Sequence, residues 1–264
     1  MEYQKYKPSK SLENYIDFYW TLSSDNLADI YTARTYPDGC TNILFNFADP
    51  IHLDIADKGF VQNALPTSIY GNVTRFFHFK VSGRIDLFSV NFKPGGIFPV
   101  LQLPVSEFNN RAIDAKFASI DSDTTLFERL AASSDTESRI GLFEQFLIKK
   151  LLRFDQTDPV VDYSLNRITT VHGNTAIDTI VRETGISERQ LERKFKLRVG
   201  ISPKLLCQIL RFKHVQNVLK YGSPQSLLNI AYDNGYFDHA HLTNNFRRFA
   251  GVTPSYFSQY LPYF

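Results

Sequence analysis

Alternation of apolar and polar side chains is the first pattern along the chain, and it occupies residues 30–92. Every second residue is apolar or aromatic in three segments, residues 42–47, 76–81 and 88–93. A period of two with aromatic and β-branched residues is typical of half-buried strands. Because no long helical pattern separates these segments, they predict a small β-barrel or sandwich.

Three short segments predict the turns of this sheet. Residues 36–39 (Tyr-Pro-Asp-Gly) form a turn because proline fixes φ at its second position and glycine takes a positive φ. Residues 81–84 predict a hairpin. Residues 93–96 (Lys-Pro-Gly-Gly) predict a turn that closes the sheet, since they lack the flanking pattern of a phosphate-binding loop.

Helical spacing of apolar residues flanks the sheet on both sides. Residues 8–20 predict a short first helix that ends at Trp20, the one tryptophan of the chain. Residues 126–131 predict another helix, and residues 140–154 carry an apolar stripe at a spacing of three and four. The helix over residues 140–154 either packs on its own sheet or pairs with a second subunit.

The strongest pattern is an internal repeat within residues 175–260. Five residues recur at an offset of 51: Ser187, Leu191, Phe195, Gly200 and Pro203 return as Asp238, Leu242, Phe246, Gly251 and Pro254. Three residues just upstream recur at an offset of 50: Ile177, Ile180 and Gly185 return as Leu227, Ile230 and Gly235. A repeat at a fixed period indicates one supersecondary unit built twice.

Each copy predicts two helices joined by a tight turn. In the first copy Gly185 ends a helix in the left-handed conformation, and Ser187 caps the next helix with Gln190 three residues on. Pro203 then occupies the first position of a long helix over residues 203–220, where its missing N–H costs nothing. A helix-turn-helix pair of this kind lays its second helix in a DNA major groove.

The second helix of each copy has a polar face opposite its buried residues. We predict that these faces bind DNA through Arg189, Glu192, Arg193 and Lys196 in the first copy and through His239, Thr243, Asn244 and Arg247 in the second. Arginine reads guanine, asparagine reads adenine and glutamate reads cytosine through matching donors and acceptors. The alternative is that each face is an ordinary solvated helix surface. Two matched helices at one repeat distance favour DNA binding over this alternative.

These residues resemble the AraC/XylS-type DNA-binding domain over about residues 160–261. The matching positions run from Gly185, Ser187, Leu191 and Phe195 through Gly200 and Pro203 to Ile230, Gly235, Leu242, Phe246, Gly251 and Pro254. The resemblance implies a seven-helix domain with two helix-turn-helix units and the same eight residues at the DNA. Tyr236 and Leu242 stand where phenylalanine is common, and Phe257 stands where tyrosine is common; all three are core positions.

A shorter resemblance covers the N-terminal part. Residues 36–39 and 93–96 look similar to the corresponding region of some AraC-like regulators. This resemblance implies a sensor or assembly domain, with a small-molecule effector, a homodimer and RNA polymerase as candidate partners. It names no ligand, and it leaves activation and repression open, although activation is the expectation that we carry forward.

The charge of the chain is unevenly distributed. Residues 1–158 carry 16 Lys and Arg against 20 Asp and Glu, whereas residues 159–264 carry 13 against 7. The net charge of +2 therefore combines an acidic part with a basic part. A basic C-terminal part is typical of a nucleic-acid-binding module attached to a part that does not bind nucleic acid.

Residues for catalysis or metal binding are few. Cys40 and Cys207 stand in different predicted domains and have no metal-ligand spacing. His239 and His241 point to different faces of a helix, so they are poor joint ligands. We therefore expect no enzyme, no cofactor and no metal.

No apolar run approaches 18 residues and no signal core follows Met1, so we also expect no membrane contact and a cytoplasmic protein.

Together these patterns predict an α+β N-terminal domain over residues 1–155, a linker over residues 156–159 and an all-α domain over residues 160–261. The N-terminal domain is a small β-barrel or sandwich with helices, and the second contains two helix-turn-helix units joined by a long helix. The expected function is a regulator that reads two adjacent major-groove segments of double-stranded DNA. The alternative is a ligand-binding or catalytic β-barrel protein whose DNA binding is vestigial.

Overall fold

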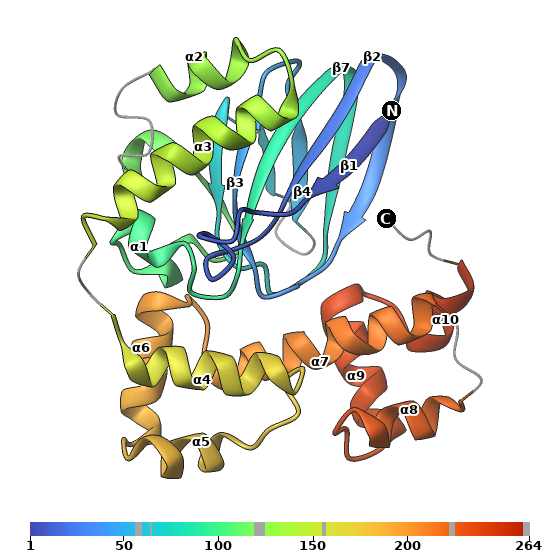
Figure 1. Ribbon diagram of the computed structural model, residues 1–264. Helices are drawn as coiled ribbons and strands as arrows, with labels where there is room; N and C mark the ends of the chain where they lie inside the picture. The colour runs from blue at the N-terminus through green and yellow to red at the C-terminus, as the bar shows by residue number, and fades with distance from the viewer. Residues whose placement is uncertain (56–59, 64, 119–124, 155–156, 222–224, 261–264) are drawn as a thin grey trace.

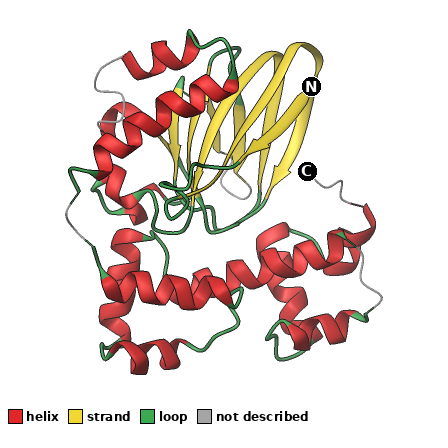
Figure 2. Ribbon diagram, in the orientation of Figure 1, coloured by secondary structure: helices red, strands yellow, loops and turns green. Residues whose placement is uncertain are grey.

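The computed structural model describes residues 1–55, 60–63, 65–118, 125–154, 157–221 and 225–260. Strands and covering helices make up the part up to residue 154, here called the sheet region. Helices alone make up the part from residue 159, here called the helical region (Figures 1 and 2). The predicted order, an α+β part followed by an all-helical part, is confirmed, and the β part is an antiparallel sheet covered by helices. Within the described residues, no helix combines the length and the apolar character needed to cross a membrane.

One antiparallel sheet organises the sheet region. Its strands are β1 (Glu2–Tyr6), β2 (Ile16–Thr35), β3 (Thr41–Asn46), β4 (His52–Ile55), β5 (Phe60–Asn63), β6 (Thr67–Tyr70), β7 (Phe77–Phe92) and β8 (Ala112–Asp114). The main path is β1-β2-β7-β3-β6-β8, and β4 pairs with both β7 and β5. The long strands β2 and β7 pair along their length, from Ile16 with Phe92 to Thr35 with Phe77. On the edge away from β2, strand β7 pairs with two strands: β4 pairs with the beginning of β7 and β3 with its end.

The predicted helix over residues 8–20 is wrong. Short hydrogen-bonded turns form there instead: the Leu12 N–H donates to the Ser9 carbonyl, and the N–H groups of Tyr15 and Ile16 both donate to the Leu12 carbonyl. From Ile16 onward the chain is strand β2, which pairs with β7. Aromatic and branched side chains at this spacing fit a pleated, half-buried surface once a neighbouring strand is present.

The predicted hairpin over residues 81–84 is also wrong, because β7 continues through it. The register between β2 and β7 shifts on both sides of the pair formed by Leu27 and Gly83. Gly83 takes a φ of +71° there, and the N–H of Arg84 donates to the Asp49 carboxylate at 2.8 Å. A bulge in a long strand uses a glycine with positive φ as readily as a hairpin does.

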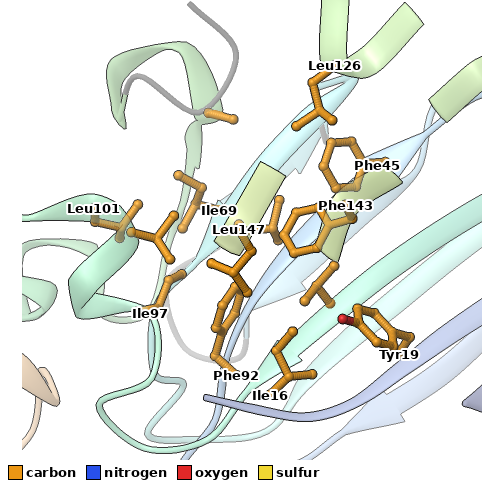
Figure 3. Packing of buried hydrophobic residues seen from close by; sticks show 14 of the residues in the cluster. Ile16, Tyr19, Phe45, Ile69, Phe92, Ile97, Leu101, Leu126, Phe143 and Leu147 are labelled. Atoms are coloured by element: carbon orange, nitrogen blue, oxygen red, sulfur yellow. The ribbon is translucent and has the colours of Figure 1, made fainter. Parts of the chain in front are cut away.

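Helix α3 (Thr136–Leu151) covers one face of the sheet, together with α1 (Phe98–Leu101) and α2 (Thr125–Ala131). Figure 3 shows Phe143 and Leu147 of α3 among the strand side chains Phe45 and Phe92. The Phe143 ring contacts Phe45 edge to face, with ring centroids 6.0 Å apart, and it is fully buried. Burial of such a side chain stabilises the fold by about 1.5–3 kcal/mol. The apolar stripe of α3 therefore packs on its own sheet, as the first of the two sequence interpretations has it.

The helical region has a separate core. Its helices are α4 (Pro159–Thr170), α5 (Ile177–Thr184), α6 (Glu188–Arg198), α7 (Pro203–Lys220), α8 (Leu227–Asp233), α9 (His239–Ala250) and α10 (Pro254–Tyr260). Helix α7 covers the predicted residues 203–220 and runs between the two halves of this region (Figure 1). Its Phe212 ring lies 4.9 Å from Phe246 and 5.4 Å from Phe249 of α9. The connecting helix is thus part of the core of the second unit.

Helix α4 begins at Pro159, inside the segment expected to be a linker. The Asp158 carboxylate accepts a hydrogen bond from the Val161 N–H and caps this helix. The last two residues of the expected linker are therefore a helix cap and the first residue of a helix, while residue 156 lies outside the described residues.

Candidate nucleic-acid interface

The first helix-turn-helix unit is α5 followed by α6. Gly185 ends α5 with a φ of 68°, in the left-handed region. The Ser187 hydroxyl accepts from the Gln190 N–H at 3.3 Å, and the Gln190 side chain accepts from the Ser187 N–H at 2.9 Å. This capping box starts α6, and the fully buried Leu191 and Phe195 fix which face of α6 turns inward.

The second unit, α8 followed by α9, repeats this construction. Gly235 has a φ of +70° after α8, and the Asp238 carboxylate accepts from the His241 N–H at 2.7 Å. Leu242 and Phe246 are fully buried at the positions that Leu191 and Phe195 hold in the first unit. The equivalence predicted from the 51-residue offset therefore holds for both the caps and the buried faces.

The predicted DNA-contacting side chains fall into two groups by exposure. Six are exposed, and these are Arg189, Arg193, Lys196, His239, Asn244 and Arg247. Glu192 and Thr243 are half-buried, and they hold equivalent positions in the two units. The Thr243 hydroxyl is covered and forms no hydrogen bond with the described residues, so it faces inward in this structure.

Four basic side chains of the helical region outside the predicted set are engaged within the protein. Lys194 lies 2.7 Å from the Asp158 carboxylate, and Arg198 lies 3.7 Å from it. Arg211 donates to the Gly235 carbonyl at 2.7 Å, and Arg248 donates to the Gln208 side chain at 3.1 Å. These four cations hold helices together.

Four exposed cations of α6 and α9 have no carboxylate partner among the described residues. Arg189, Arg193, Lys196 and Arg247 form no ion pair there within 4.0 Å. An exposed cation without a carboxylate partner keeps its full interaction with a phosphate or a base edge. These four cations are therefore available to bind DNA, whereas Lys194, Arg198, Arg211 and Arg248 contact other groups of the protein.

Asp158 ties the start of α4 to α6 by charge as well as by capping. Burial raises the pKa of this carboxyl group, but Lys194, the Val161 N–H and Arg198 together outweigh burial and hold the pKa below its usual value. The group therefore stays ionised at neutral pH and keeps Lys194 and Arg198 close to the start of α4.

A cavity of about 360 Å³ lies between the sheet and α7. Its wall is mainly apolar and includes the aromatic side chains of Phe18, Trp20, Tyr70 and Phe77. The Trp20 indole N–H donates to the Asn91 side chain at 2.9 Å. The buried Tyr70 hydroxyl forms no hydrogen bond of normal geometry with the described residues, and burial raises its pKa despite the nearby Ser68. A cavity of this size, with apolar side chains and several polar ones in its wall, suits a small organic molecule.

The charged side chains of this cavity are mostly basic. Lys5, Arg34 and Lys213 line it against the single carboxylate of Asp38. Burial alone would lower the pKa of Lys213, but acidic groups nearby, the carboxylates of Asp38 and Asp17 among them, raise it above its usual value. Lys213 therefore remains a cation at neutral pH.

The sequence did not reveal this cavity. Arg34 stands on β2 and Lys213 on α7, and only the packing of the helical region on the sheet brings them together. Turn residues 36–39 were predicted, and Asp38 of that turn lines the cavity. No period or spacing in the sequence links these positions.

Metal ligands do not gather in the part of the chain that the structure describes. No group of three or more His, Cys, Asp or Glu side chains there is placed to hold a metal ion. Cys40 and Cys207 are free and buried, and burial is the main cause that raises the pKa of each thiol. A buried neutral thiol is a poor nucleophile.

Comparisons with known proteins match two parts of the chain. Residues 4–114 match a family described as a domain of unknown function (DUF6597), and residues 180–260 match a family described as a helix-turn-helix domain. A search of curated proteins found no match. The helix-turn-helix match confirms the resemblance, so the C-terminal part carries a helix-turn-helix domain of the AraC type.

Three solved structures align with the chain at low sequence identity. ToxT from Vibrio cholerae is 12% identical, with 98% of each chain covered and a TM-score of 0.45. ToxT from V. cholerae strain SCE256 with a bound unsaturated fatty acid is 15% identical, with 91% of this chain and 94% of that chain covered and a TM-score of 0.45. The AraC-like transcriptional activator CuxR is 12% identical, with 81% and 86% covered and a TM-score of 0.34.

Proposed function

We propose that this protein is a sequence-specific transcriptional regulator that reads two adjacent major-groove segments of DNA with α6 and α9. The base-reading side chains are Arg189, Glu192, Arg193 and Lys196 on α6 and His239, Thr243, Asn244 and Arg247 on α9. The Thr243 hydroxyl faces inward in this structure, and we infer that the methyl group of this side chain contacts the methyl group of a thymine.

One observation carries this proposal. Two helices that start from equivalent caps, Ser187 and Asp238, bury equivalent residues and expose cations that lack ion-pair partners among the described residues. Exposed cations without ion-pair partners can bind DNA, so they support the proposal that the protein is a DNA-binding regulator. The rival protein, a ligand-binding or catalytic barrel with vestigial DNA binding, would have no use for such an arrangement.

Binding-site selection from random double-stranded DNA with the purified full-length protein tests this function. The proposal predicts an enriched motif with two parts and an affinity that falls steeply with salt. Each phosphate neutralised contributes about −0.9 to the slope of log affinity against log salt concentration. A chain that enriches no motif, or that binds DNA without salt dependence, would support the rival protein.

We propose that a small organic molecule controls DNA binding from the cavity between the sheet and α7. The aromatic and aliphatic side chains of the wall supply apolar contact, and Lys5, Arg34 and Lys213 supply positive charge. Trp20, the one tryptophan of the chain, lines the cavity, so its fluorescence reports binding directly. A screen that changes neither Trp20 fluorescence nor the melting temperature would leave the sheet region as an assembly module.

The domain division is part of the same proposal. The helical region has its own cluster of buried side chains, which includes Phe195, Phe212 and Phe246. We therefore expect a fragment of residues 155–264 to fold alone and bind DNA. An unfolded fragment in circular dichroism would show that the two regions form one folding unit.

Homodimerisation and contact with RNA polymerase belong to the same proposal. The exposed Ile148 and Leu152 near the end of α3 offer apolar surface for a second subunit. Sedimentation of the full-length protein tests the dimer, and a Leu152→Glu variant that sediments as a monomer would locate the contact. Transcription with purified polymerase decides between activation and repression.

A further inference from the structure

Side chains of the sheet region bind the carbonyl groups at the ends of both reading helices. Asn72 donates to the Val199 carbonyl at 2.6 Å, just after α6. Arg34 donates to the Ala250 carbonyl at 3.3 Å, at the end of α9. Val199 and Ala250 are 51 residues apart, so the two contacts fall on equivalent positions of the repeat.

A second pair of equivalent positions brings the backbone close to the sheet region. The Gly200 carbonyl accepts from the Asn109 side chain at 2.6 Å. A Cβ on Gly200 would lie 2.9 Å from Asn72, and a Cβ on Gly251 would lie 2.4 Å from the Phe76 ring. Both glycines also have positive φ, so other residues would be strained there in any case.

These contacts satisfy groups that a helix leaves open. The last carbonyls of a helix lack intrahelical partners, and the helix dipole makes this end favourable for cations. Asn72 is buried and places its amide at the end of α6, while the Arg34 guanidinium supplies a positive charge at the end of α9. The sheet region therefore fixes both reading helices by the same end.

Arg34 also belongs to the cavity wall. Its guanidinium stacks over the Phe76 ring at 4.7 Å, and its Nε donates to the His78 imidazole at 3.4 Å. Phe76 in turn is the side chain that lies against Gly251. One side chain thus contacts both the space proposed for the effector and the end of α9.

Resting on the function proposed above, we propose that the sheet region clamps α6 and α9 in their reading arrangement, and that an aromatic organic anion in the cavity binds Arg34 and releases α9. The aromatic side chains within the wall favour an aromatic body, and three cations against one carboxylate favour an anionic group. An anion that pairs with Arg34 competes with the neutral Ala250 carbonyl, which is the weaker acceptor.

Hydrogen–deuterium exchange of the full-length protein without DNA tests the clamp, so its result is independent of any failure to bind DNA. Arg34→Ala should raise exchange about tenfold at the end of α9, around residues 247–251, and leave the end of α6 unchanged. Asn72→Ala should do the reverse. Arg84→Ala is the matched control, because Arg84 is an exposed sheet-region arginine that donates to the Phe47 carbonyl. Equal changes at both helix ends, or none, would overturn the clamp.

The effector class is tested with 4-phenylbutyrate and its uncharged match, 4-phenylbutanol. The anion should change Trp20 fluorescence at lower concentration than the alcohol and should raise exchange at the end of α9 alone. In Arg34→Ala the advantage of the anion should disappear. Equal binding of the two probes, binding of neither, or binding of the anion without a change at α9 would overturn the coupling.

Discussion

Ser187 and Asp238 lie 51 residues apart and occupy the same position in their units. Each side chain accepts a hydrogen bond from the N–H group three residues on, at 3.3 Å from Gln190 and 2.7 Å from His241. Each therefore determines where its reading helix begins and which side chains that helix exposes. The two predicted DNA-contacting faces depend on these two caps.

Removal of either cap should destabilise the helical region. Ser187→Ala and Asp238→Ala should each lower the free energy of unfolding by about 0.5–2 kcal/mol, because a buried or terminal N–H loses its acceptor. Urea unfolding of the full-length protein measures the change. Ser187→Thr and Asp238→Asn keep an acceptor at the cap and should lower the free energy of unfolding by less. If the alanine variants and these variants lose the same free energy, the cap hydrogen bonds do not stabilise the helices.

Loss of Arg193 should weaken base recognition. Arg193 is exposed on α6 and has no ion-pair partner among the described residues, so Arg193→Ala should cost about 1–3 kcal/mol in DNA binding and relax the preference at one base pair. Arg248→Ala is the control, because Arg248 donates to Gln208 of α7 and should contribute little specificity. Arg193→Ala with the same loss on every DNA sequence would make Arg193 a phosphate contact.

Low pH should destabilise the protein through a pair of stacked histidines. His172 and His214 have ring centroids 4.3 Å apart, in a cavity of about 90 Å³ that Arg211 and Asp233 also line. Burial, and then the charge of His172, lower the pKa of His214. A group whose pKa is lowered on folding contributes stability above its unfolded pKa, about 6.5, and this stability is lost as the pH falls below that value.

The free energy of unfolding should therefore decrease between pH 7.5 and pH 5.5. His214→Gln should reduce this slope without abolishing it, because burial also lowers the pKa of His78, beside Arg34 and with Asp54 and Lys80 nearby. Denaturant titrations at several pH values measure the slope. A variant with an unchanged slope would show that the stacked pair does not contribute.

The helical region could be predicted in detail because its determinants are local. Caps such as Ser187, glycines such as Gly185 and the proline at position 203 each act within one turn of the chain. The repeat then confirmed each assignment a second time. The predicted helix over residues 203–220 agrees with α7 for the same reason.

The sheet region was harder to predict because its determinants are distant in the sequence. Residues 16–20 form a strand only because β7 lies beside them, and Gly83 marks a bulge only because β2 shifts register opposite it. The cavity depends on Arg34 and Lys213, which stand 179 residues apart. Such contacts follow from tertiary packing, which overrides local preference.

The rigid connection between the units makes the central claim open to a direct measurement. Helix α7 has 18 residues, and a helix of that length spans about 27 Å at about 1.5 Å per residue. Successive major-groove segments on one face of DNA lie about 34 Å apart, or about 10 base pairs. The two subsites should differ in sequence, because Arg193 and Lys196 in the first unit correspond to Asn244 and Arg247 in the second.

The measurement is the affinity of the full-length protein for its selected DNA site before and after insertion of about 5 base pairs between the two subsites. Such an insertion turns one subsite to the opposite face of the duplex. We predict that the affinity falls to that of a site with a single intact subsite. An insertion of about 10 base pairs puts both subsites back on the same face of the duplex but leaves them about one helical turn farther apart. Unchanged affinity after the half-turn insertion would contradict the claim that α6 and α9 read two adjacent grooves together.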